Sequence, residues 1–420
     1  MKKLISVIIT LVTALLSFSV SVYADAATDE FGEYLSEKFE NYVTSEIDIS
    51  GYVRKNGWDM EETCDAIASV YYSHPEFFFV HNGYKYAVIN DNITSIIFEY
   101  DIPKASLAEA RECFDAAARK VVEGITDDMT DVDKALYVHD YLILNCRYDT
   151  AQKRYSAYNC LIEQLCVCQG YTLAYEYILN EYLGIPCSAA YSDDTNHIWN
   201  YVKIGNNWYH VDLTLDDLYD SYNGASYDRH GFVSHKNFLM SDTLCKSASD
   251  MHKNWKLCDK LPAAGDNSFD KAFWRNINSK INYADGKYYY ISYGGKDGGK
   301  NIVNVCRYDL STQKNVTLAR LKCVWYSRRG AGFAQAAAYG TRVYSDIFSS
   351  IEYMNGKLYF NSNKTVYSYN LSTKKLKTLY TLNKGEEMQL FGLAQADGKL
   401  RLVYRKDLTY PDNYLKLQFR

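Results

Sequence analysis

The sequence is poor in proline and carries no excess of positive charge. Only 5 of its 420 residues are prolines, and 51 acidic residues outnumber 46 basic ones, which leaves a formal net charge of −5. Binding to the phosphate backbone of nucleic acid needs clustered basic charge, so we expect no nucleic-acid partner. The sequence also lacks an aspartate-rich loop of the kind that binds calcium. We therefore expect neither a metal nor a cofactor.

Long apolar runs are confined to the first residues of the chain. Lys2 and Lys3 precede an apolar run from Leu4 to Val22, and Ala24 supplies a small side chain where a signal peptidase reads. No basic stop-transfer cluster follows, so a cleaved signal peptide over residues 1–24 is favoured over a retained anchor. Nothing later approaches a membrane-spanning stretch. We expect a secreted or cell-surface protein with no transmembrane span after signal removal.

The rest of the chain is typical of a folded protein of two or three domains. It is 47% hydrophobic and 23% charged, which is enough apolar material for sizeable cores. We expect an α+β region over residues 27–130, a region that carries the motifs described below over residues 131–260, and a β-repeat domain over residues 265–420.

Helical and strand spacing outline the α+β region. Four segments show such spacing: helices over 29–44 and 58–72, and strands over 84–88 and 93–100. A capping box, in which an acid follows a Ser or Thr by three residues, marks a helix start. Ser106 with Glu109 predicts a helix that runs to Val122, and Thr130 with Asp133 predicts a second helix.

Eleven cysteines in an exported chain first suggest a disulfide framework. This chain is much longer than the small scaffolds that disulfides hold together. An odd count leaves at least one thiol unpaired, which points to chemistry or to pairing between molecules. Several of the cysteines are expected simply to pack as small hydrophobic residues.

Cys168 stands at or just before the start of a well-marked helix. Apolar residues from Tyr171 to Tyr182 recur along one helical face, Gly184 supplies a C-terminal cap, and Pro186 prevents continuation. The unpaired N–H groups and the positive dipole end of such a helix favour an anion at its first residue. A thiolate at Cys168 is therefore favoured.

A predicted hairpin follows this helix and carries a histidine and an aspartate. Strands over 187–191, 197–204 and 207–213 are expected, with Gly205-Asn206 as a two-residue turn. That turn pairs Ile204 with Asn207, which places His197 and Trp199 on the same face as His210 and Asp212. Asp212 is then the diagonal neighbour of His197, about 7–8 Å away and within side-chain reach.

These three residues are the parts of a thiol acyl-transfer site. His197 would take the proton of Cys168, and Asp212 would fix the imidazole tautomer. Alone, each residue has an ordinary explanation: a packed cysteine, a satisfied histidine and a turn-capping aspartate. Their order, the helix start and the hairpin register together favour the thiol site.

At this point the sequence resembles the transglutaminase-like superfamily, whose core shares the papain-like thiol fold. The resemblance covers roughly Ala135 to Asp217. It rests on Tyr158 and four runs: Val167 to Tyr171, Gly184-Ile185-Pro186, His197 to Asn200, and Trp208 to Thr214. The resemblance implies Cys168 as nucleophile, His197 as general base and acid, and Asp212 as the orienting carboxylate. It also implies an α+β fold, with an α+β lead-in before the core and a mainly β, propeller-blade-like tail.

Two residues depart from the family pattern. Cys166 stands where a small residue such as glycine is expected, and Leu213 replaces a common proline. A Cys166–Cys168 disulfide would be strained and could silence the nucleophile. A zinc site among the neighbouring cysteines is disfavoured, because the usual two-residue gap within ligand pairs is missing.

The oxyanion and substrate contacts are less defined by sequence. The backbone N–H of Cys168 is one candidate donor, and the candidate side chains are those of Trp199, Gln164 and Tyr171.

The C-terminal part repeats a tyrosine-rich hairpin. Similar runs surround Asp285-Gly286, Asn355-Gly356 and Asp397-Gly398, as in successive propeller blades. Three repeats are fewer than the roughly four blades of the smallest closed propellers. The sequence therefore predicts a β-repeat domain without deciding whether the repeats close into a propeller. We expect residues 265–420 to position the protein on its target.

The sequence thus predicts a secreted transglutaminase-like thiol enzyme that acts on protein or peptide substrates. A Cys-His-Asp triad would attack peptide or glutamine carboxamide groups, as in a cysteine protease or a protein cross-linking enzyme. The alternative is a non-catalytic binding protein with a degenerate triad, whose tyrosines, 41 in all, grip a cell-wall or cell-surface glycan.

Overall fold

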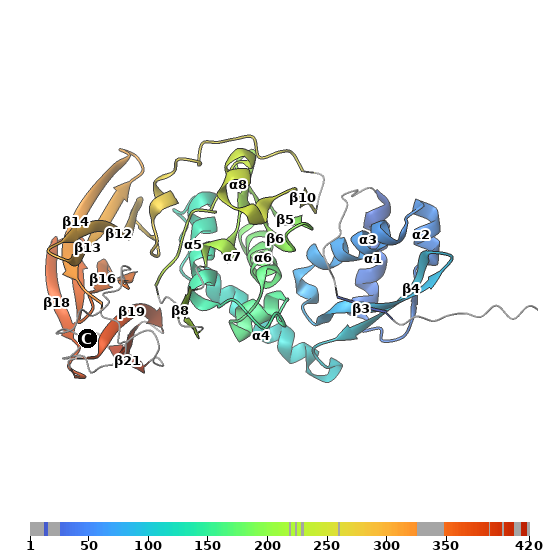
Figure 1. The fold of residues 1–420 in the computed structure, drawn as a ribbon, viewed down its shortest axis with the longest axis horizontal. Coiled ribbons are helices and arrows are strands. Elements are labelled where there is room, and N and C mark those ends of the chain that lie inside the picture. The colour runs from blue at the N-terminus through green and yellow to red at the C-terminus, as the bar shows by residue number, and fades with distance from the viewer. Residues whose placement is uncertain are drawn as a thin grey trace, which may run out of the picture. The chain divides into compact units, whose positions relative to one another are not determined.

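A computed structural model describes most of the chain (Figure 1). The described residues are 12–15, 26–217, 220–222, 225–227, 231–258, 261–325, 348–385, 387–396, 399–406 and 413–417. They divide into two compact units. The first unit comprises Met1–Gly124, Tyr148–Thr214 and Asn237–Lys271, and the second unit comprises Ile125–Arg147, Leu215–Lys236 and Ala272–Arg420. The predicted consecutive domain limits stay predictions.

The first unit begins with three helices and a small antiparallel sheet. The helices are α1 (Ala26–Glu40), α2 (Ser50–Asn56) and α3 (Met60–Tyr72), and the sheet order is β1 (Val12–Leu15), β3 (Val80–Ile89), β4 (Asn92–Tyr100) and β2 (Ile47–Asp48). Phe31, Leu35 and Phe39 form one buried face of α1 because they lie four residues apart. The two predicted helices and two predicted strands of this region are confirmed.

One predicted capping box forms and the other does not. Thr130 caps α5 (Asp131–Asn145) by a reciprocal bond with Asp133. Ser106 precedes α4 (Leu107–Val122), but its side chain makes no capping hydrogen bond. The reason is that Ser106 ends a short 3-10 turn and already has helical dihedrals, φ −101° and ψ −2°, whereas a capping residue is normally extended.

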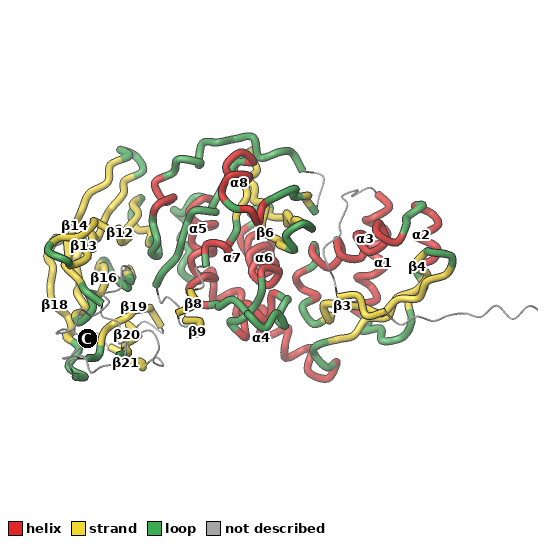
Figure 2. The backbone as a smooth tube through the Cα atoms, viewed as in Figure 1, coloured by secondary structure: helices red, strands yellow, loops and turns green. Residues whose placement is uncertain are grey.

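The rest of the first unit is a four-stranded antiparallel sheet with helix α6 packed against it. The sheet order is β10 (Lys256–Leu257), β5 (Cys187–Ser192), β6 (His197–Ile204) and β7 (Asn207–Val211). Helix α6 (Cys168–Tyr177) continues as a π-helical turn over Ile178–Tyr182 and lies beside β6 (Figure 2). A second π-helical turn, Asn159–Glu163, precedes it, and α8 (Asp242–Ala248) and a 3-10 turn at Asp250–His252 follow the sheet.

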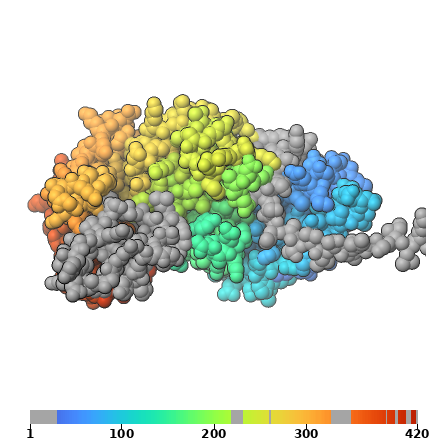
Figure 3. All heavy atoms as spheres, viewed as in Figure 1, coloured from blue at the N-terminus to red at the C-terminus, as the bar shows by residue number. Residues whose placement is uncertain are grey.

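The β6–β7 register is the one that the sequence predicts. Ile204 pairs with Asn207 and Asn200 with Val211, so the two-residue turn at Gly205-Asn206 is confirmed. Cys168 is the first residue of α6, and Gly184 has a left-handed φ of +64° after the helix ends. On the face drawn in Figure 3, the green-to-yellow atoms of residues 148–214 and 237–271 adjoin.

The second unit is mainly antiparallel strand. Its first sheet contains β11 (Asn282–Ala284), β12 (Lys287–Asp297), β13 (Lys300–Asp309) and β14 (Lys314–Cys323). The next contains β15 (Ile351–Met354), β16 (Lys357–Asn361), β17 (Thr365–Asn370) and β18 (Lys375–Thr381), and the third contains β19 (Gln389–Ala396), β20 (Lys399–Arg405) and β21 (Asn413–Leu417). The predicted mainly β C-terminal part is confirmed.

Shorter elements complete the second unit. They are α7 (Leu213–Asp216), which begins in the first unit, a two-stranded ribbon of β8 (Asp220–Tyr222) and β9 (Ala225–Tyr227), and a 3-10 turn at Phe273–Asn276.

Repeated two-residue turns shape these sheets. Asp285 and Gly286 both have positive φ, as do Asn355 and Gly356, which is the geometry of the primed turns that suit hairpins. The third predicted turn, Asp397-Gly398, lies outside the described residues, but Ala396 pairs with Lys399 across it. Whether the repeats close as a propeller stays a prediction.

Two global features bear on the predicted class of protein. Among the described residues, no helix has both the length and the apolar character needed to cross a membrane. None of the eleven cysteines, all of which are described, takes part in a disulfide. The signal peptide stays a prediction.

The two N-caps make a matched pair for a stability test. We expect Thr130→Ala to lower the free energy of unfolding by about 1 kcal/mol, because the cap of α5 is lost. Ser106→Ala removes no capping bond and should cost roughly 0.5 kcal/mol or less. Urea unfolding of the full chain measures both changes. Equal losses would contradict the assignment of the caps.

Candidate active site

The three residues of the predicted site lie together inside the first unit. Cys168 opens α6, His197 opens β6, and Asp212 directly follows β7. The thiol of Cys168 lies close enough to the imidazole of His197 to help raise the pKa of that ring. Nε2–H of that imidazole donates to Oδ2 of Asp212 over 2.6 Å. Because Nε2 is engaged by the carboxylate, Nδ1 is the nitrogen available to the sulfur.

Two side chains hold α6 against β6 close to the thiol. The hydroxyl of Thr172 lies 3.0 Å from the Cys168 carbonyl and 3.2 Å from the Ile198 carbonyl. Asn200 Nδ2 donates to the Thr172 carbonyl over 2.9 Å. These bonds join the first turn of the helix to the strand that carries His197, so the sulfur and the imidazole are held by the fold rather than by a loop.

The site is almost closed to solvent, and its charges perturb one another. Cys168 is 7% exposed, His197 2% and Asp212 0%. Burial by itself lowers the pKa of His197, but the charge and hydrogen bond of Asp212 and the contact with Cys168 outweigh it and raise the pKa to about 10. Burial opposes ionisation of Asp212 as well, yet the two neighbouring histidines hold its pKa well below the ordinary 3.8.

Asp212 also accepts a hydrogen bond from a second histidine, which the sequence analysis does not identify. His252 Nε2 lies 2.8 Å from the same Oδ2 that accepts from His197, and its Nδ1 lies 3.3 Å from the Cys245 carbonyl. His252 is 1% exposed. No local pattern marks it, because it reaches the site from a 3-10 turn forty residues beyond Asp212 in the chain.

These two histidines and Asp212 also have the spacing of a possible metal site. One ligand atom from each lies within 4.8 Å of the others. A metal there would occupy Nε2 of His197, the nitrogen that Asp212 orients, so we interpret the trio through its hydrogen bonds.

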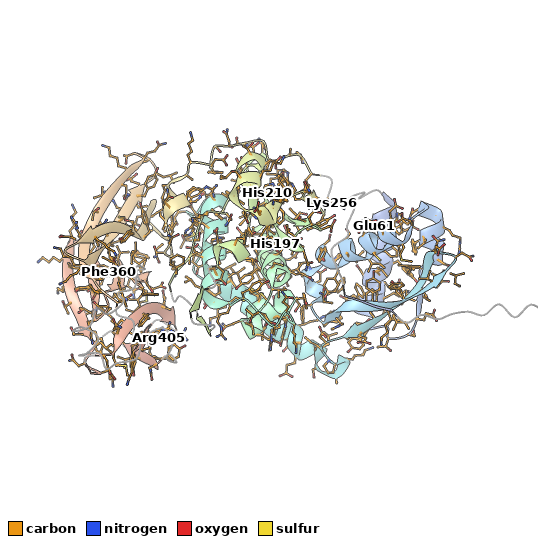
Figure 4. All side chains as sticks on the ribbon, in the orientation of Figure 1. Glu61, His197, His210, Lys256, Phe360 and Arg405 are labelled. Atoms are coloured by element: carbon orange, nitrogen blue, oxygen red, sulfur yellow. The ribbon has the colours of Figure 1, made fainter. Side chains whose placement is uncertain are left out.

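Trp199 fills the space between the histidines. Its ring stacks on His197, with centroids 5.6 Å apart and planes at 24°, and lies 4.7 Å from the ring of His252. Its indole N–H donates to His210 Nδ1 over 3.0 Å, and His210 Nε2–H donates to Asp242 over 2.9 Å. Figure 4 labels His197 and His210, which come from the adjacent strands β6 and β7.

In this structure the only N–H of Trp199 is given to His210, so the predicted oxyanion role of Trp199 would require that bond to break. The signal was present in the sequence: the hairpin register puts Trp199 and His210 on one face. Gln164 is exposed and has a left-handed φ of +56° at the end of the preceding π-helical turn. Tyr171 is 1% exposed and belongs to the packed side of α6. Burial leaves Tyr171 little access to a substrate, and a substrate contact of the exposed Gln164 stays a prediction.

The backbone N–H of Cys168 stays a candidate oxyanion donor. As the first residue of α6, its N–H has no acceptor within the helix. The neighbouring N–H groups of Gly170 and Tyr171 are instead turned back to the Val167 carbonyl, at 3.0 and 3.3 Å. A developing negative oxygen beside the sulfur would meet the free end of the helix dipole.

Gly170 explains how Cys166 is accommodated. A Cβ at position 170 would lie 2.4 Å from Cys166 Cβ and 2.8 Å from its sulfur, closer than any real contact. The larger Cys166 side chain therefore occupies the space that the glycine leaves open. The departure from the family pattern is a packing substitution in this structure.

We predict that two nearby histidines of the site carry different charges at neutral pH, because the pKa of one is raised and that of the other is lowered. We expect His197 to stay an imidazolium through neutral pH and to titrate near the pKa of about 10. His210 should be neutral at pH 7, because burial lowers its pKa more than Asp242 raises it. NMR of ¹⁵N-histidine-labelled protein, assigned with His197→Asn and His210→Asn, measures both.

This difference has a consequence for stability. Because the folded pKa of His197 lies above its ordinary 6.5, its charge stabilises the fold fully below about pH 6.5, and this contribution is lost as pH rises through about 10. A neutral His197 at pH 7 would contradict the proposed charge arrangement.

His252 gives a second test. We expect His252→Ala to raise the pKa of His197 further, because Asp212 then serves one imidazole only. It should also lower the free energy of unfolding by about 2 kcal/mol, the usual worth of a hydrogen bond to a charged group. His252→Gln, whose amide can still donate to Asp212, is the control and should show smaller changes. An unchanged His197 titration in His252→Ala would exclude the coupling.

Comparison with known proteins identifies the region that contains the site. Residues 115–213 match the model of the transglutaminase-like superfamily, and this range includes Cys168, His197 and Asp212. A comparison with curated proteins gave no match.

Solved structures show only remote likeness. The chain is similar to a structure titled "Crystal structure of a TGase" at 11% identity and a TM-score of 0.24, over 37% of this chain and 50% of that one. It is also similar to two structures of the extracellular domain of BT4673 from B. thetaiotaomicron, at 15% and 14% identity and a TM-score of 0.21. The two matches cover 51% and 52% of this chain and 26% of each of the two solved chains.

The chain thus spans half or less of the length of each structure it resembles. Likeness at this level carries no argument about function, and the assignment depends on the matched residues 115–213. Residues 115–213 of the chain are therefore similar to the core of the transglutaminase-like superfamily.

Proposed function

We propose that the protein is an exported thiol enzyme that transfers or hydrolyses acyl groups at peptide or glutamine carboxamide bonds. The observation that carries the proposal is the contact chain from Cys168 through His197 to Asp212, with the thiol at a helix start. Transglutaminase-like proteins as a class act on protein substrates, which agrees with a carboxamide in a peptide as the target.

The first half of the reaction uses Cys168 and His197 as a pair. His197 lies beside the Cys168 thiol and can take its proton, so that the sulfur attacks as a thiolate. A C–S bond forms and the carbonyl π electrons move to oxygen, where the N–H of Cys168 can stabilise the charge. His197 then gives its proton to the leaving nitrogen, and ammonia or an amine departs.

The second half reverses the proton transfer. His197, now neutral, takes a proton from water or from a second amine as that nucleophile attacks the thioester carbon. Collapse of the intermediate breaks the C–S bond and returns the sulfur as thiolate. Water gives hydrolysis and an amine gives cross-linking, and both outcomes use the same acyl enzyme.

Asp212 and its neighbours serve the imidazole in both halves. The carboxylate fixes the ring with Nε2–H toward Asp212 and Nδ1 toward the sulfur, and it stabilises the imidazolium. The stacked Trp199 prevents the ring from turning. We further propose that the signal peptide directs export and that the β-rich residues 265–420 place the core on its target.

Replacement of the nucleophile tests the proposal. We expect Cys168→Ala to lower activity on a glutamine-containing peptide by at least about a thousandfold and to abolish labelling of this site by iodoacetamide at mildly acidic pH. Cys113→Ala is the matched control, because Cys113 is exposed and distant in sequence from the site, and it should keep full activity.

Two results would count against the enzyme. Unchanged activity in Cys168→Ala would remove the assigned nucleophile. If the labelling rate of Cys168 falls at mildly acidic pH as steeply as that of Cys113, the binding-protein alternative is favoured, since both thiols would then lose their thiolate form alike.

A further inference from the structure

A second buried cluster of histidines and carboxylates lies in the other compact unit. It contains His139 and Asp140 from α5, Asp216 at the end of α7, and His235. His139, Asp216 and His235 are 0% exposed and Asp140 is 1% exposed. All four belong to the second unit, and none takes part in the proposed reaction.

Three atoms of this cluster converge. Asp140 Oδ1 lies 3.0 Å from His139 Nδ1 and 2.9 Å from His235 Nε2. All three atoms lie within 4.8 Å of one another, and the two imidazole rings are 5.4 Å apart. Two nitrogens and one carboxylate oxygen at this spacing form a donor set suited to a divalent transition metal.

Each of these three residues also makes a hydrogen bond on the side that faces away from the other two. His139 Nε2 lies 3.3 Å from Asp216 Oδ2, and His235 Nδ1 lies 2.9 Å from the Ile277 carbonyl. Asp140 Oδ2 accepts from the Ile281 N–H over 2.8 Å. Metal-binding histidines usually donate their other ring N–H to a carboxylate or a carbonyl, and ligating carboxylates are themselves hydrogen-bonded. All three residues of the cluster have such an outer hydrogen bond.

The outward contacts of the two rings also suit a metal. All four ring nitrogens of the two histidines face oxygen atoms. A histidine that binds an ion through one nitrogen can donate from the other, and here the outward nitrogen faces Asp216 or the Ile277 carbonyl.

We propose that His139 Nδ1, His235 Nε2 and Asp140 Oδ1 form a metal site for a divalent transition ion, with Zn²⁺ as the first candidate. Three protein ligands leave one position of a tetrahedral ion for a further donor. The site ties α5 to His235 and to residues 277–281, which lead into the first β sheet. Its burial assigns it a structural role, separate from the thiol chemistry proposed above.

Metal content of the full-length protein tests this proposal. We expect about one zinc per chain, by mass spectrometry of the purified protein, and a loss of most of it in His235→Ala. Asp216→Ala removes the partner of His139 and should weaken zinc binding by about 10-fold to 100-fold in a chelator competition. His252→Ala is the matched control: it removes a buried histidine beside a carboxylate in the first unit and should keep the metal.

A second measurement covers the case in which His235→Ala fails to fold. Wild-type protein stripped by chelator should regain several degrees of thermal midpoint on addition of zinc, and Cys168→Ala should do the same. The proposal is overturned if stripped protein gains nothing from Zn²⁺, Co²⁺ or Mn²⁺, or if His252→Ala, and not His235→Ala, loses the zinc. Binding by the cysteines alone would leave His235→Ala with the wild-type content, which also overturns it.

Discussion

The arrangement of the candidate site depends on one carboxylate oxygen, Oδ2 of Asp212. It accepts from His197 and from His252 inside a region with almost no exposed surface. A buried carboxylate is costly unless it is paired, and two imidazoles supply that pairing. The carboxylate in turn keeps His197 charged, with a pKa of about 10. The charge and the orientation of the His197 ring both follow from this ionised oxygen.

Within the described part of the chain, both compact units contain a buried group of histidines and aspartates, and the partners of the histidines differ between the two groups. In the first unit, His197 bonds a carboxylate on one side and a thiol on the other, which is an arrangement for moving a proton. In the second unit, both nitrogens of His139 and of His235 face oxygen acceptors. That arrangement is suited to holding an ion in place.

Local patterns were sufficient for much of the fold. The helix after Cys168, the β6–β7 register and the two-residue turns of the β repeats follow from side-chain periodicity and turn chemistry within short segments. The Ser106 cap failed for an equally local reason, since the preceding 3-10 turn had already given Ser106 helical dihedrals. The hairpin register places Trp199 and His210 on one face, and in the structure the indole N–H of Trp199 donates to His210.

The sequence alone determined that a cysteine, a histidine and an aspartate would meet, because a helix start and a tight hairpin constrain them within one continuous stretch. It could not place His252 against Asp212, or His235 against Asp140, which are 40 and 95 residues apart in the chain. Contacts at that separation leave no periodicity to detect. Only the packing of the folded chain brings those imidazoles to the carboxylates, because a buried negative charge requires a partner wherever the chain can supply one.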